Sequence, residues 1–418
     1  MCAFLLTAFA ILAVLNYWIG RDPRYPPFLM SAVWLLVLIV YYMAPAEVFP
    51  VGLATSIIFI LATMAFSAGG LITFRVFAPS TQTESPSSVL RKRPPLHPRV
   101  KKFLLGTSVL LLPFMINRAI WLAAQSGIEQ FFIGLRVEIS LPDSIGYGLI
   151  ANASTLSYIT TFLYFVEVGS GVREKWQRYF SLLISVIYAV LSTGRTSIFL
   201  ILVALMGILW MRRRFSLKML IAIAMVSVLA FSAFAVALKK GADPDAPWSE
   251  NIGLIRESLV IYVVGALPAF DVLVKKDAPL EYGETTFSAW INIVRRVTGR
   301  PLISPIQEEV FVPFPINVYT AIQPAYKDFG IVGVILIFTL IGALSSYFYA
   351  KALAGDLLHI YYYSLSLFPL LLSAFTDQYF ASMVSWMKFL LAGYLYFRWR
   401  STSVSSRDST AIQALSTA

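Results

Sequence analysis

The segment Ser192–Ser197, with the sequence STGRTS, joins two apolar runs and combines an arginine with a glycine and four hydroxyl side chains. A helix that begins here directs its unpaired N–H groups and positive dipole end towards the turn. Candidate caps of this helix are Thr193, Thr196 and Ser197. Gly194 would allow the turn, and the planar guanidinium of Arg195 is suited to phosphate oxygens. The motif indicates an anion site; a capped hairpin whose arginine reaches lipid headgroups is the alternative.

The two flanking runs, Tyr179–Thr193 and Thr196–Met211, are shorter than the roughly 20 residues that a helix needs to cross a bilayer. Two short helices joined by a tight turn place that turn below the membrane surface. We therefore expect the STGRTS turn to lie in a recess at the depth of the lipid headgroups.

Arg118 is a second cation that could meet an anion inside the membrane, because it lies in the apolar segment FMINRAIWLA. A charge in such a segment is costly unless it is paired or hydrated. Further arginines on the same, outer side are Arg136, Arg256, Arg295, Arg296 and Arg300. This concentration of arginine is unusual for the face opposite the cytoplasm. An ordinary solvated or headgroup-facing side chain is the alternative for each of them.

Two further ionisable residues belong to the last apolar run: Lys388 at its middle and Asp377 near its outer end. A proton or ion relay needs several such groups facing one another, and the apolar runs otherwise contain very few. The sequence therefore argues against an ion-coupled pump. We expect Lys388 to lie against a carbonyl, a carboxylate or a hydrated cavity.

Histidine, the usual acid–base residue, is missing from the outer face, because His97 and His359 both map to cytoplasmic ends. Acid–base chemistry outside would then use carboxylates or tyrosines. The candidate carboxylates are Glu257, Asp271, Glu281, Glu284, Glu308, Glu309 and Asp328. The sequence has no P-loop, serine nucleophile elbow or paired zinc ligands, and its one cysteine, Cys2, excludes a disulfide framework. We expect no metal or other cofactor.

The composition indicates an integral membrane protein. Of 418 residues, 58% are hydrophobic and only 13% are charged, which is more apolar surface than a water-soluble fold of this length can bury. The net charge of +11 comes largely from short basic runs between apolar segments, as the positive-inside rule describes. This pattern excludes a nucleic-acid partner and leaves membrane lipids as the first expected partner.

Eleven apolar segments are long enough, or nearly so, to cross the roughly 30 Å hydrocarbon layer as helices. They are Ala3–Gly20, Phe28–Met43, Val51–Ile72, Phe103–Ala124, Ile145–Val168, Tyr179–Thr193, Thr196–Met211, Leu217–Leu238, Ile331–Tyr349, Ile360–Phe375 and Ala381–Phe397. Basic residues in alternate short connections assign those connections to the cytoplasm. With a cytoplasmic C-terminus, eleven spans put the N-terminus outside.

We therefore expect an all-α, polytopic transmembrane bundle with one large, partly helical outer loop. The expected parts are an eight-helix bundle (1–238), the outer loop (239–328), the C-terminal transmembrane helices (329–400) and a cytoplasmic tail (401–418). The cytoplasmic stretch Pro79–Pro98 is expected to be a flexible linker. In the loop, the apolar run Leu259–Val274 contains Gly265 and Pro268, which favours an interfacial or re-entrant helix; a twelfth span is the alternative.

The segment PINVYTAIQPAYKDFGIVGVI (Pro315–Ile335) resembles the NVYT, P and DFG pattern before a late helix in Wzy-type polymerases. These enzymes polymerise lipid-linked oligosaccharide repeat units in bacterial O-antigen and polysaccharide assembly. STGRTSIF, IYVVGALPAFD and RDPRYPPFLMSAVWLLVLI are similar to further parts of that family's sequence. The positions that carry the resemblance are Asn317, Tyr319, Pro324, Asp328, Phe329, Gly330, Gly194 and Arg195. Asp328 is also expected to cap the late helix, and Gly330 to let it pack closely.

The resemblance implies a metal-independent glycosyltransferase of the bacterial inner membrane that acts on the periplasmic face. Its donor would be a glycan on undecaprenyl pyrophosphate, its acceptor another lipid-linked unit, and a chain-length regulator is a candidate partner. Arg195, with Arg118 or a loop arginine, would stabilise the departing diphosphate. Asp328 or Glu257 would deprotonate the attacking sugar hydroxyl. Thr196, Ser197 and Asn317 would contact substrate, and Tyr319, Trp248 and Trp290 would stack on sugar rings.

Three other functions remain open from the sequence. A flippase for lipid-linked oligosaccharides would have short loops and a charge-lined central cavity, whereas this chain places its surplus residues in one outer loop. The ligase that transfers finished polymer to lipid A core shares the lipid donor, but the outer histidine expected in it is absent. The glycan polymerases of cell shape and division also share the donor and the membrane architecture.

Overall fold

The structure is a computed structural model that describes residues 2–44, 49–78, 98–141, 146–167, 171–212, 260–261, 263–276, 278–304, 307–312 and 315–398. Within these residues, six helical segments are long and apolar enough to span a membrane. They comprise α1 (Cys2–Gly20), α2 (Pro26–Met43), α3 (Leu53–Phe77), α5 (Pro98–Gln125), the 3-10 turn η1 (Gly148–Ala151) with α7 (Asn152–Val166), and α14 (Gln323–Leu353). This is the architecture of an all-α, multi-pass membrane protein, as the sequence predicts.

The other described helices are shorter or more polar. They are α6 (Phe131–Ser140), α8 (Val172–Leu191), α9 (Arg195–Met211), α12 (Ala266–Lys276), α13 (Ser288–Thr298), α15 (Leu357–Leu372) and a last helix over residues 383–398. A short antiparallel pair, β1 (Val310–Phe311) and β2 (Pro315–Ile316), completes the described elements. Ten of the eleven expected spans coincide with these helices. Leu217–Leu238 lies outside the described residues, as do residues 79–97 of the expected linker and the tail 401–418, so the count of eleven stays a prediction.

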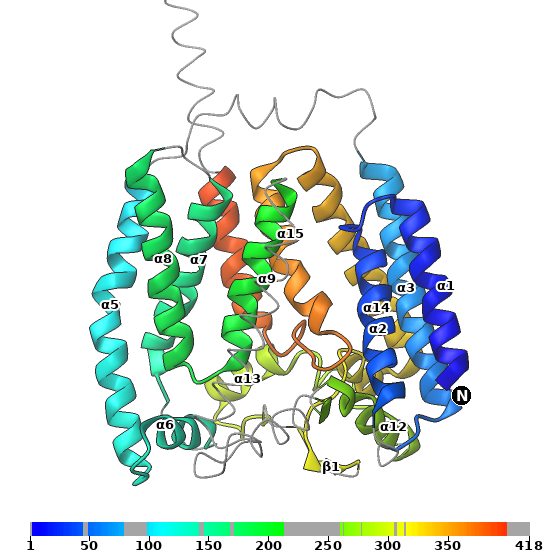
Figure 1. Ribbon diagram of the computed structural model, residues 1–418. Coiled ribbons are helices and arrows are strands. Elements are labelled where there is room, and N and C mark those ends of the chain that lie inside the picture. Colours follow the sequence, from blue (N-terminus) through cyan, green and yellow to red (C-terminus); the bar gives the residue numbers. More distant parts are fainter. Residues whose placement is uncertain are drawn as a thin grey trace, which may run out of the picture.

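The long helices run side by side between two ends of the bundle (Figure 1). One end carries α6, α12, α13 and the strand pair, and we call it the loop end. The N-terminus lies at the loop end, and the helix over 383–398 finishes at the opposite end. The connection between α1 and α2, with Arg21 and Arg24, also lies opposite the loop end. The N-terminus and the end of the last helix thus lie at opposite ends of the bundle, and the assignment of either end to the cytoplasm stays a prediction.

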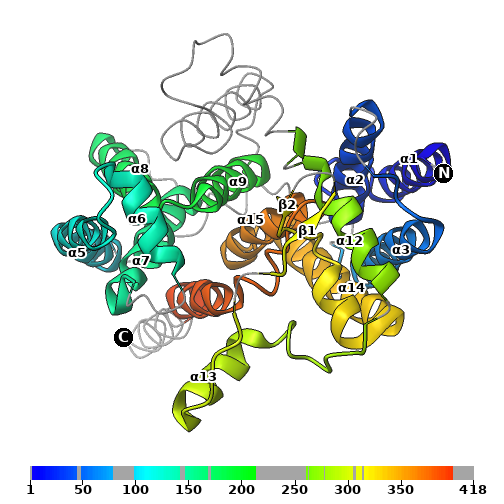
Figure 2. The same ribbon diagram turned by 90° about the horizontal axis from the view of Figure 1, so that it is seen from below.

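The buried apolar side chains form two cores. One core gathers residues of α5, α7, α8, α9, α15 and the last helix, and the other gathers residues of α1, α2, α3, α12 and the first part of α14. The corresponding helix groups lie side by side in the view along the bundle, with α15 between them (Figure 2). Side chains of α15 belong to both cores, Phe368 to the first and Leu370 to the second. This helix therefore joins the two halves.

Helices α3 and α14 pack backbone against backbone, at two glycines. A Cβ on Gly69 would overlap the carbonyl oxygen of Thr339, and a Cβ on Gly342 would overlap that of Phe66. Small residues allow this close approach between transmembrane helices, where packing rather than hydrophobic burial drives association. The contact therefore depends on glycine at both positions.

The expectation of two short helices around STGRTS is wrong for the first of them. Helix α8 has 20 residues, because the basic residues Arg173, Lys175 and Arg178 continue the helix beyond the apolar run. Arginine and lysine are good helix formers whose long side chains can reach the membrane surface. The apolar run marks the hydrocarbon layer, and the helix continues past it. Helix α9, with 17 residues, is as short as expected.

The apolar run of the long loop forms a buried, broken helix. Residues 260–261 and 263–264 are helical, a turn follows at Gly265, and the 11 residues of α12 cover about 17 Å, too short for a span. Asp271 attaches α12 to the start of α3, since its Oδ1 accepts from the Gly52 N–H (2.7 Å) and the Thr55 hydroxyl (2.6 Å). The described part of this run therefore packs on the bundle as a short helix, in place of a twelfth span.

Candidate functional site

The STGRTS turn is made by an unexpected residue. Thr193 has a φ of 50°, in the left-handed region, whereas Gly194 has a φ of −98°. Threonine is β-branched and rarely adopts this conformation, which costs on the order of 1–3 kcal/mol unless packing holds it. Thr193 is only 1% exposed. The surrounding core, and not glycine, therefore fixes the turn.

The expected side-chain caps of α9 are also absent from the turn. Gly194 is the N-cap residue, and no side chain bonds to the first turn of the helix. The Ser192 hydroxyl instead donates to the Ala189 carbonyl (2.7 Å) and lies 3.1 Å from the Ser197 hydroxyl. These hydroxyls bond to the preceding helix and to one another, so the N–H groups at the start of α9 have no cap from this motif.

Arg195 begins α9, and its side chain points inward. Its two terminal guanidinium nitrogens are buried. The alternative in which this arginine reaches the lipid headgroups therefore does not describe the structure. Arg195 also does not line either of the two cavities described next, although Thr196 and Ser197 line the second.

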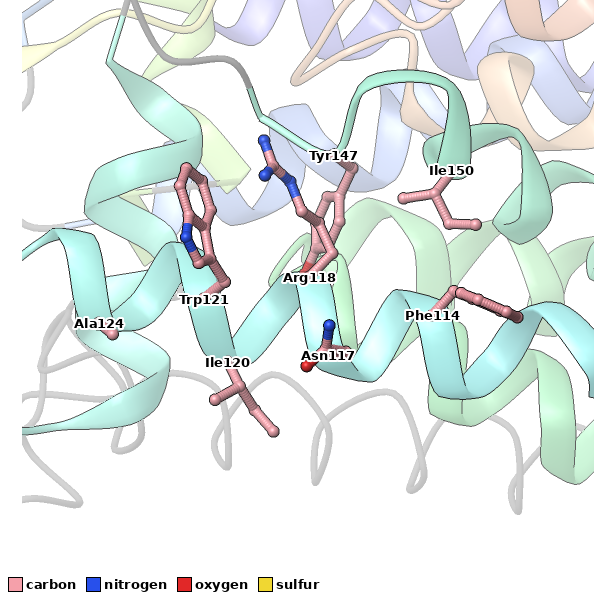
Figure 3. Close-up of a pocket in the computed structure, with 8 residues that line it drawn as sticks. All are labelled: Phe114, Asn117, Arg118, Ile120, Trp121, Ala124, Tyr147 and Ile150. Atoms are coloured by element: carbon pink, nitrogen blue, oxygen red, sulfur yellow. The ribbon is translucent and has the colours of Figure 1, made fainter.

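Arg118 faces an open cavity of about 670 Å³ on α5. Its Nε and Nη2 both donate to the Gly146 carbonyl, at 3.0 and 2.9 Å, and its guanidinium lies 4.1 Å from the ring centre of Trp121. Figure 3 shows the guanidinium between the rings of Trp121 and Tyr147. The other lining residues are Phe114, Asn117, Ile120, Ala124 and Ile150. The cavity thus combines one fixed positive charge with largely apolar walls.

Ten of the sixteen residues that line a second cavity, of about 230 Å³, carry a hydroxyl or amide group. Its polar lining residues are Tyr147, Ser154, Thr155, Tyr158, Ser192, Thr196, Ser197, Gln378, Ser382 and Ser385. Trp386 and Phe389 supply aromatic surface. This volume holds several water molecules at about 30 Å³ each. The cavity therefore suits a small, uncharged ligand with many hydroxyl groups.

Tyr147 lines both cavities and fixes their relation to the STGRTS turn. Its hydroxyl donates to the carbonyl of Leu191, the last residue of α8, at 2.6 Å. The Arg118 cavity and the hydroxyl-lined cavity therefore adjoin at Tyr147. The structure thus brings together Arg118, Thr196 and Ser197, three of the residues that the sequence singles out.

Asp328 is placed where no substrate can reach it. It is completely buried, and its two carboxylate oxygens accept from the backbone N–H groups of Thr285 (3.1 Å) and Thr286 (2.5 Å). Its carbonyl accepts from Tyr282. The expected helix cap is wrong, because α14 begins at Gln323 and the Asp328 side chain bonds to the preceding loop. The helix breaks two residues later at Gly330, whose φ is 63°.

Replacing Asp328 by asparagine is expected to loosen the loop around residues 281–286. One backbone N–H would then face an amide N–H₂ group, and losing a buried, charge-assisted hydrogen bond costs about 1–3 kcal/mol. Hydrogen exchange at Thr285 and Thr286 should become faster. The matched control is Glu309→Gln, the same change on an exposed side chain. Equal protection in both variants would contradict the role given to Asp328.

Two further positions of the resemblance lie near this loop. Tyr319 is 6% exposed and its hydroxyl donates to the Glu308 carbonyl (3.0 Å), so the expected stacking of its ring on a sugar does not fit the structure. Burial, with a smaller contribution from Glu308, raises the pKa of Tyr319 to about 12 and keeps this donor protonated. Asn317 is exposed.

The segment 373–378 links this region to the hydroxyl-lined cavity. The Ser373 carbonyl accepts from the Ala321 N–H (2.8 Å), and Gln378 lines the cavity. Between them, the half-buried Asp377 accepts from the N–H groups of Tyr379 and Phe380 with Oδ1 and from Ala381 with Oδ2. Burial raises the pKa of Asp377 to about 6, although these three N–H groups lower it. The raised pKa means that this carboxyl changes charge around pH 6.

The remaining candidates do not meet at the two cavities. Arg136 lies on α6, and Arg295, Arg296, Arg300 and Trp290 belong to α13 or the residues after it. Lys388 donates to the side-chain carbonyl oxygen of Asn152 at 2.6 Å, which agrees with the expected carbonyl partner. Trp248, Arg256 and Glu257 lie outside the described residues. Among the residues that the structure describes, no three histidine, cysteine or acidic side chains lie close enough together to hold a metal ion.

Sequence reasoning missed the residues that line most of the hydroxyl cavity. Only part of their signal is present as helical spacing: Thr155 and Tyr158 are three residues apart on one face of α7. Gln378 and Ser382 lie before the last helix, and Ser385 lies in its first turn, so no helical pattern marks this set. Comparison with family models and with curated proteins finds no match for this chain.

Proposed function

We propose that this chain is a membrane glycosyltransferase that joins oligosaccharide units carried on undecaprenyl diphosphate, as the resemblance to Wzy-type polymerases implies. The observation that supports this proposal most is the pair of adjoining cavities that share Tyr147. One combines a cation with apolar walls, and the other offers hydroxyl groups and an indole ring. A lipid diphosphate joined to a sugar has the same two chemistries side by side.

The Arg118 cavity suits the lipid diphosphate. The guanidinium can donate to phosphate oxygens, while Phe114, Ile120 and Trp121, which are 61%, 55% and 42% exposed, offer apolar surface to a polyprenyl chain. Helix α5 lies at the edge of the bundle (Figure 2). A carrier lipid would therefore reach Arg118 sideways from the bilayer.

The hydroxyl-lined cavity suits the sugar. Serine, threonine and glutamine side chains exchange hydrogen bonds with sugar hydroxyls, and Trp386 can pack against the apolar face of a sugar ring. Its position next to the STGRTS turn puts the start of α9 beside the bond between sugar and diphosphate. The buried Arg195 would then add to the positive potential there.

The proposed reaction is a displacement at the anomeric carbon of the donor. The acceptor hydroxyl forms a new C–O bond to that carbon, and the C–O bond to the diphosphate breaks. The diphosphate leaves with the electron pair, and Arg118 stabilises its charge. Asp377 does not itself line the cavity, but it precedes the cavity residue Gln378 and, unlike the completely buried Asp328, it is partly exposed; we propose that it takes the hydroxyl proton.

The rate is expected to fall as the pH is lowered through about 6. Because the folded-state pKa of Asp377 is raised to about 6, the carboxylate that accepts the proton exists above this pH and is lost below it. The measurement is the pH profile of polymer formation, compared with that of Asp377→Asn. A wild-type profile that stays flat across this range would remove Asp377 from the mechanism.

Reconstitution tests the proposed function. The full-length protein, in liposomes with undecaprenyl-diphosphate-linked oligosaccharide, should yield products of several repeat units and free undecaprenyl diphosphate. Transfer of the unit across the bilayer without elongation would instead identify a flippase. The connection between α1 and α2, with Arg21 and Arg24, lies opposite the loop end, and this supports a periplasmic position for the two cavities in a bacterial inner membrane.

A further inference from the structure

Helix α13 carries an apolar stripe that no other described part of the protein covers. Trp290, Ile293, Val294 and Val297 recur at i, i+3, i+4 and i+7, and thus share one face of the helix. They are 44%, 51%, 61% and 84% exposed, and no residue of α13 is buried. A stripe of this size is costly to leave in water.

The opposite face of α13 is tied to its own loop. The Asn292 side chain donates to the Ile303 carbonyl (3.0 Å) and accepts from the Ile303 N–H (2.7 Å). Arg295 donates to Glu284 (2.9 Å) and to the Pro301 carbonyl (3.2 Å). These bonds fix the rotation of the helix, so the apolar stripe points away from the polar loop.

The position of α13 suits the boundary between membrane and water. It lies at the loop end, at the level where the long helices finish (Figure 1), and extends outward from the bundle, across the direction of those helices (Figure 2). An amphipathic helix in this position and orientation lies in the plane of the interface. Arg296 and Arg300 are exposed beside the stripe and carry charge that complements lipid phosphates.

We propose that α13 is an in-plane membrane anchor, whose apolar stripe enters the lipid leaflet at the loop end while its arginines contact anionic headgroups. The bilayer that holds the long helices is the occupant of this face. The anchor fixes the residues around 281–286, which Asp328 holds on their other side, against the membrane. This inference stands apart from the proposed enzymatic activity.

Depth-dependent fluorescence quenching tests the anchor. In a Cys2→Ser background, which removes the one native cysteine, Val294→Cys and Val297→Cys place a probe on the stripe and Arg296→Cys places one on the polar side. The full-length variants carry an NBD label in liposomes of phosphatidylethanolamine and phosphatidylglycerol. Quenchers are nitroxide-labelled lipid and, on both sides of the bilayer, iodide.

The probes at Val294 and Val297 should emit at shorter wavelength than the probe at Arg296, lose most of their intensity to nitroxide lipid and resist iodide. The probe at Arg296 should show the reverse preference. Strong iodide quenching at all three positions would overturn the proposal. Protection from both quenchers at Val294 and Val297 would also overturn it, since a protein partner or a second copy would then cover the stripe.

Discussion

Arg118→Ala is expected to lower the rate of polymer formation by about 100-fold or more while leaving the amount of folded protein unchanged. Removing one preorganised donor from developing negative charge costs about this much in enzymes that use electrostatic stabilisation. Arg118 is half-buried, and its only hydrogen bonds given by the described structure are to the Gly146 carbonyl, so the fold should tolerate its loss. The measurement is repeat-unit polymerisation in liposomes, with thermal unfolding in parallel.

Two further variants make the Arg118 experiment specific. Arg118→Lys keeps the charge but loses the fork and the stacking on Trp121, so a partial loss of rate is expected. Arg99→Ala makes the same change on an exposed residue at the other end of α5 and should leave the rate unchanged. If Arg118→Ala polymerises at the wild-type rate, the diphosphate does not bind in this cavity.

Gly342→Val is expected to prevent α3 and α14 from packing, with loss of most folded protein. Even a single Cβ here overlaps the Phe66 carbonyl oxygen, and the backbone on both sides cannot move without separating the helices. Overpacking typically costs about 1–3 kcal/mol, and at a backbone contact we expect the upper end or more. That is a large part of a typical stability of about 5–15 kcal/mol. The measurement is the yield of monodisperse protein after detergent extraction.

The matched control is Gly106→Val in α5. A Cβ at Gly106 meets nothing within 4 Å, so the same change in side-chain volume has open space. Valine also has a better helix propensity than glycine. This variant should therefore be extracted in normal yield. Equal yields from both variants would mean that α3 and α14 do not meet at Gly342.

The sequence predicts the helices of the described structure well, because lipid imposes one simple rule. The bilayer interior requires each span to be a helix of about 20 apolar residues. Such a span can be recognised from the hydropathy of its own segment alone. The hydropathy does not reveal where a helix ends beyond the hydrocarbon layer. The starts of α5 and α8 therefore lie earlier than expected, in basic sequence that a helix tolerates.

The sequence predicts only part of the candidate site, because residues that lie far apart in the chain form it together. Arg118, Thr196 and Ser197 stand out as polar residues in apolar sequence, and the structure places them at adjoining cavities. Tyr147 and Trp386 have no such local signal, since aromatic residues are common in membrane helices. Asp328 stands out in sequence through its motif, but only the fold shows that Thr285 and Thr286 occupy its oxygens.

The glycine contact between α3 and α14 also bears on how this chain is made. Gly342 is synthesised about 270 residues after Gly69, a delay on the order of tens of seconds at ribosomal rates. During that interval α3 sits in the bilayer without its main neighbour, which a helix tolerates because its backbone groups are satisfied internally. The part of the second core that α14 completes therefore forms only after α14 has been synthesised and docks against the α3 helix already in the bilayer.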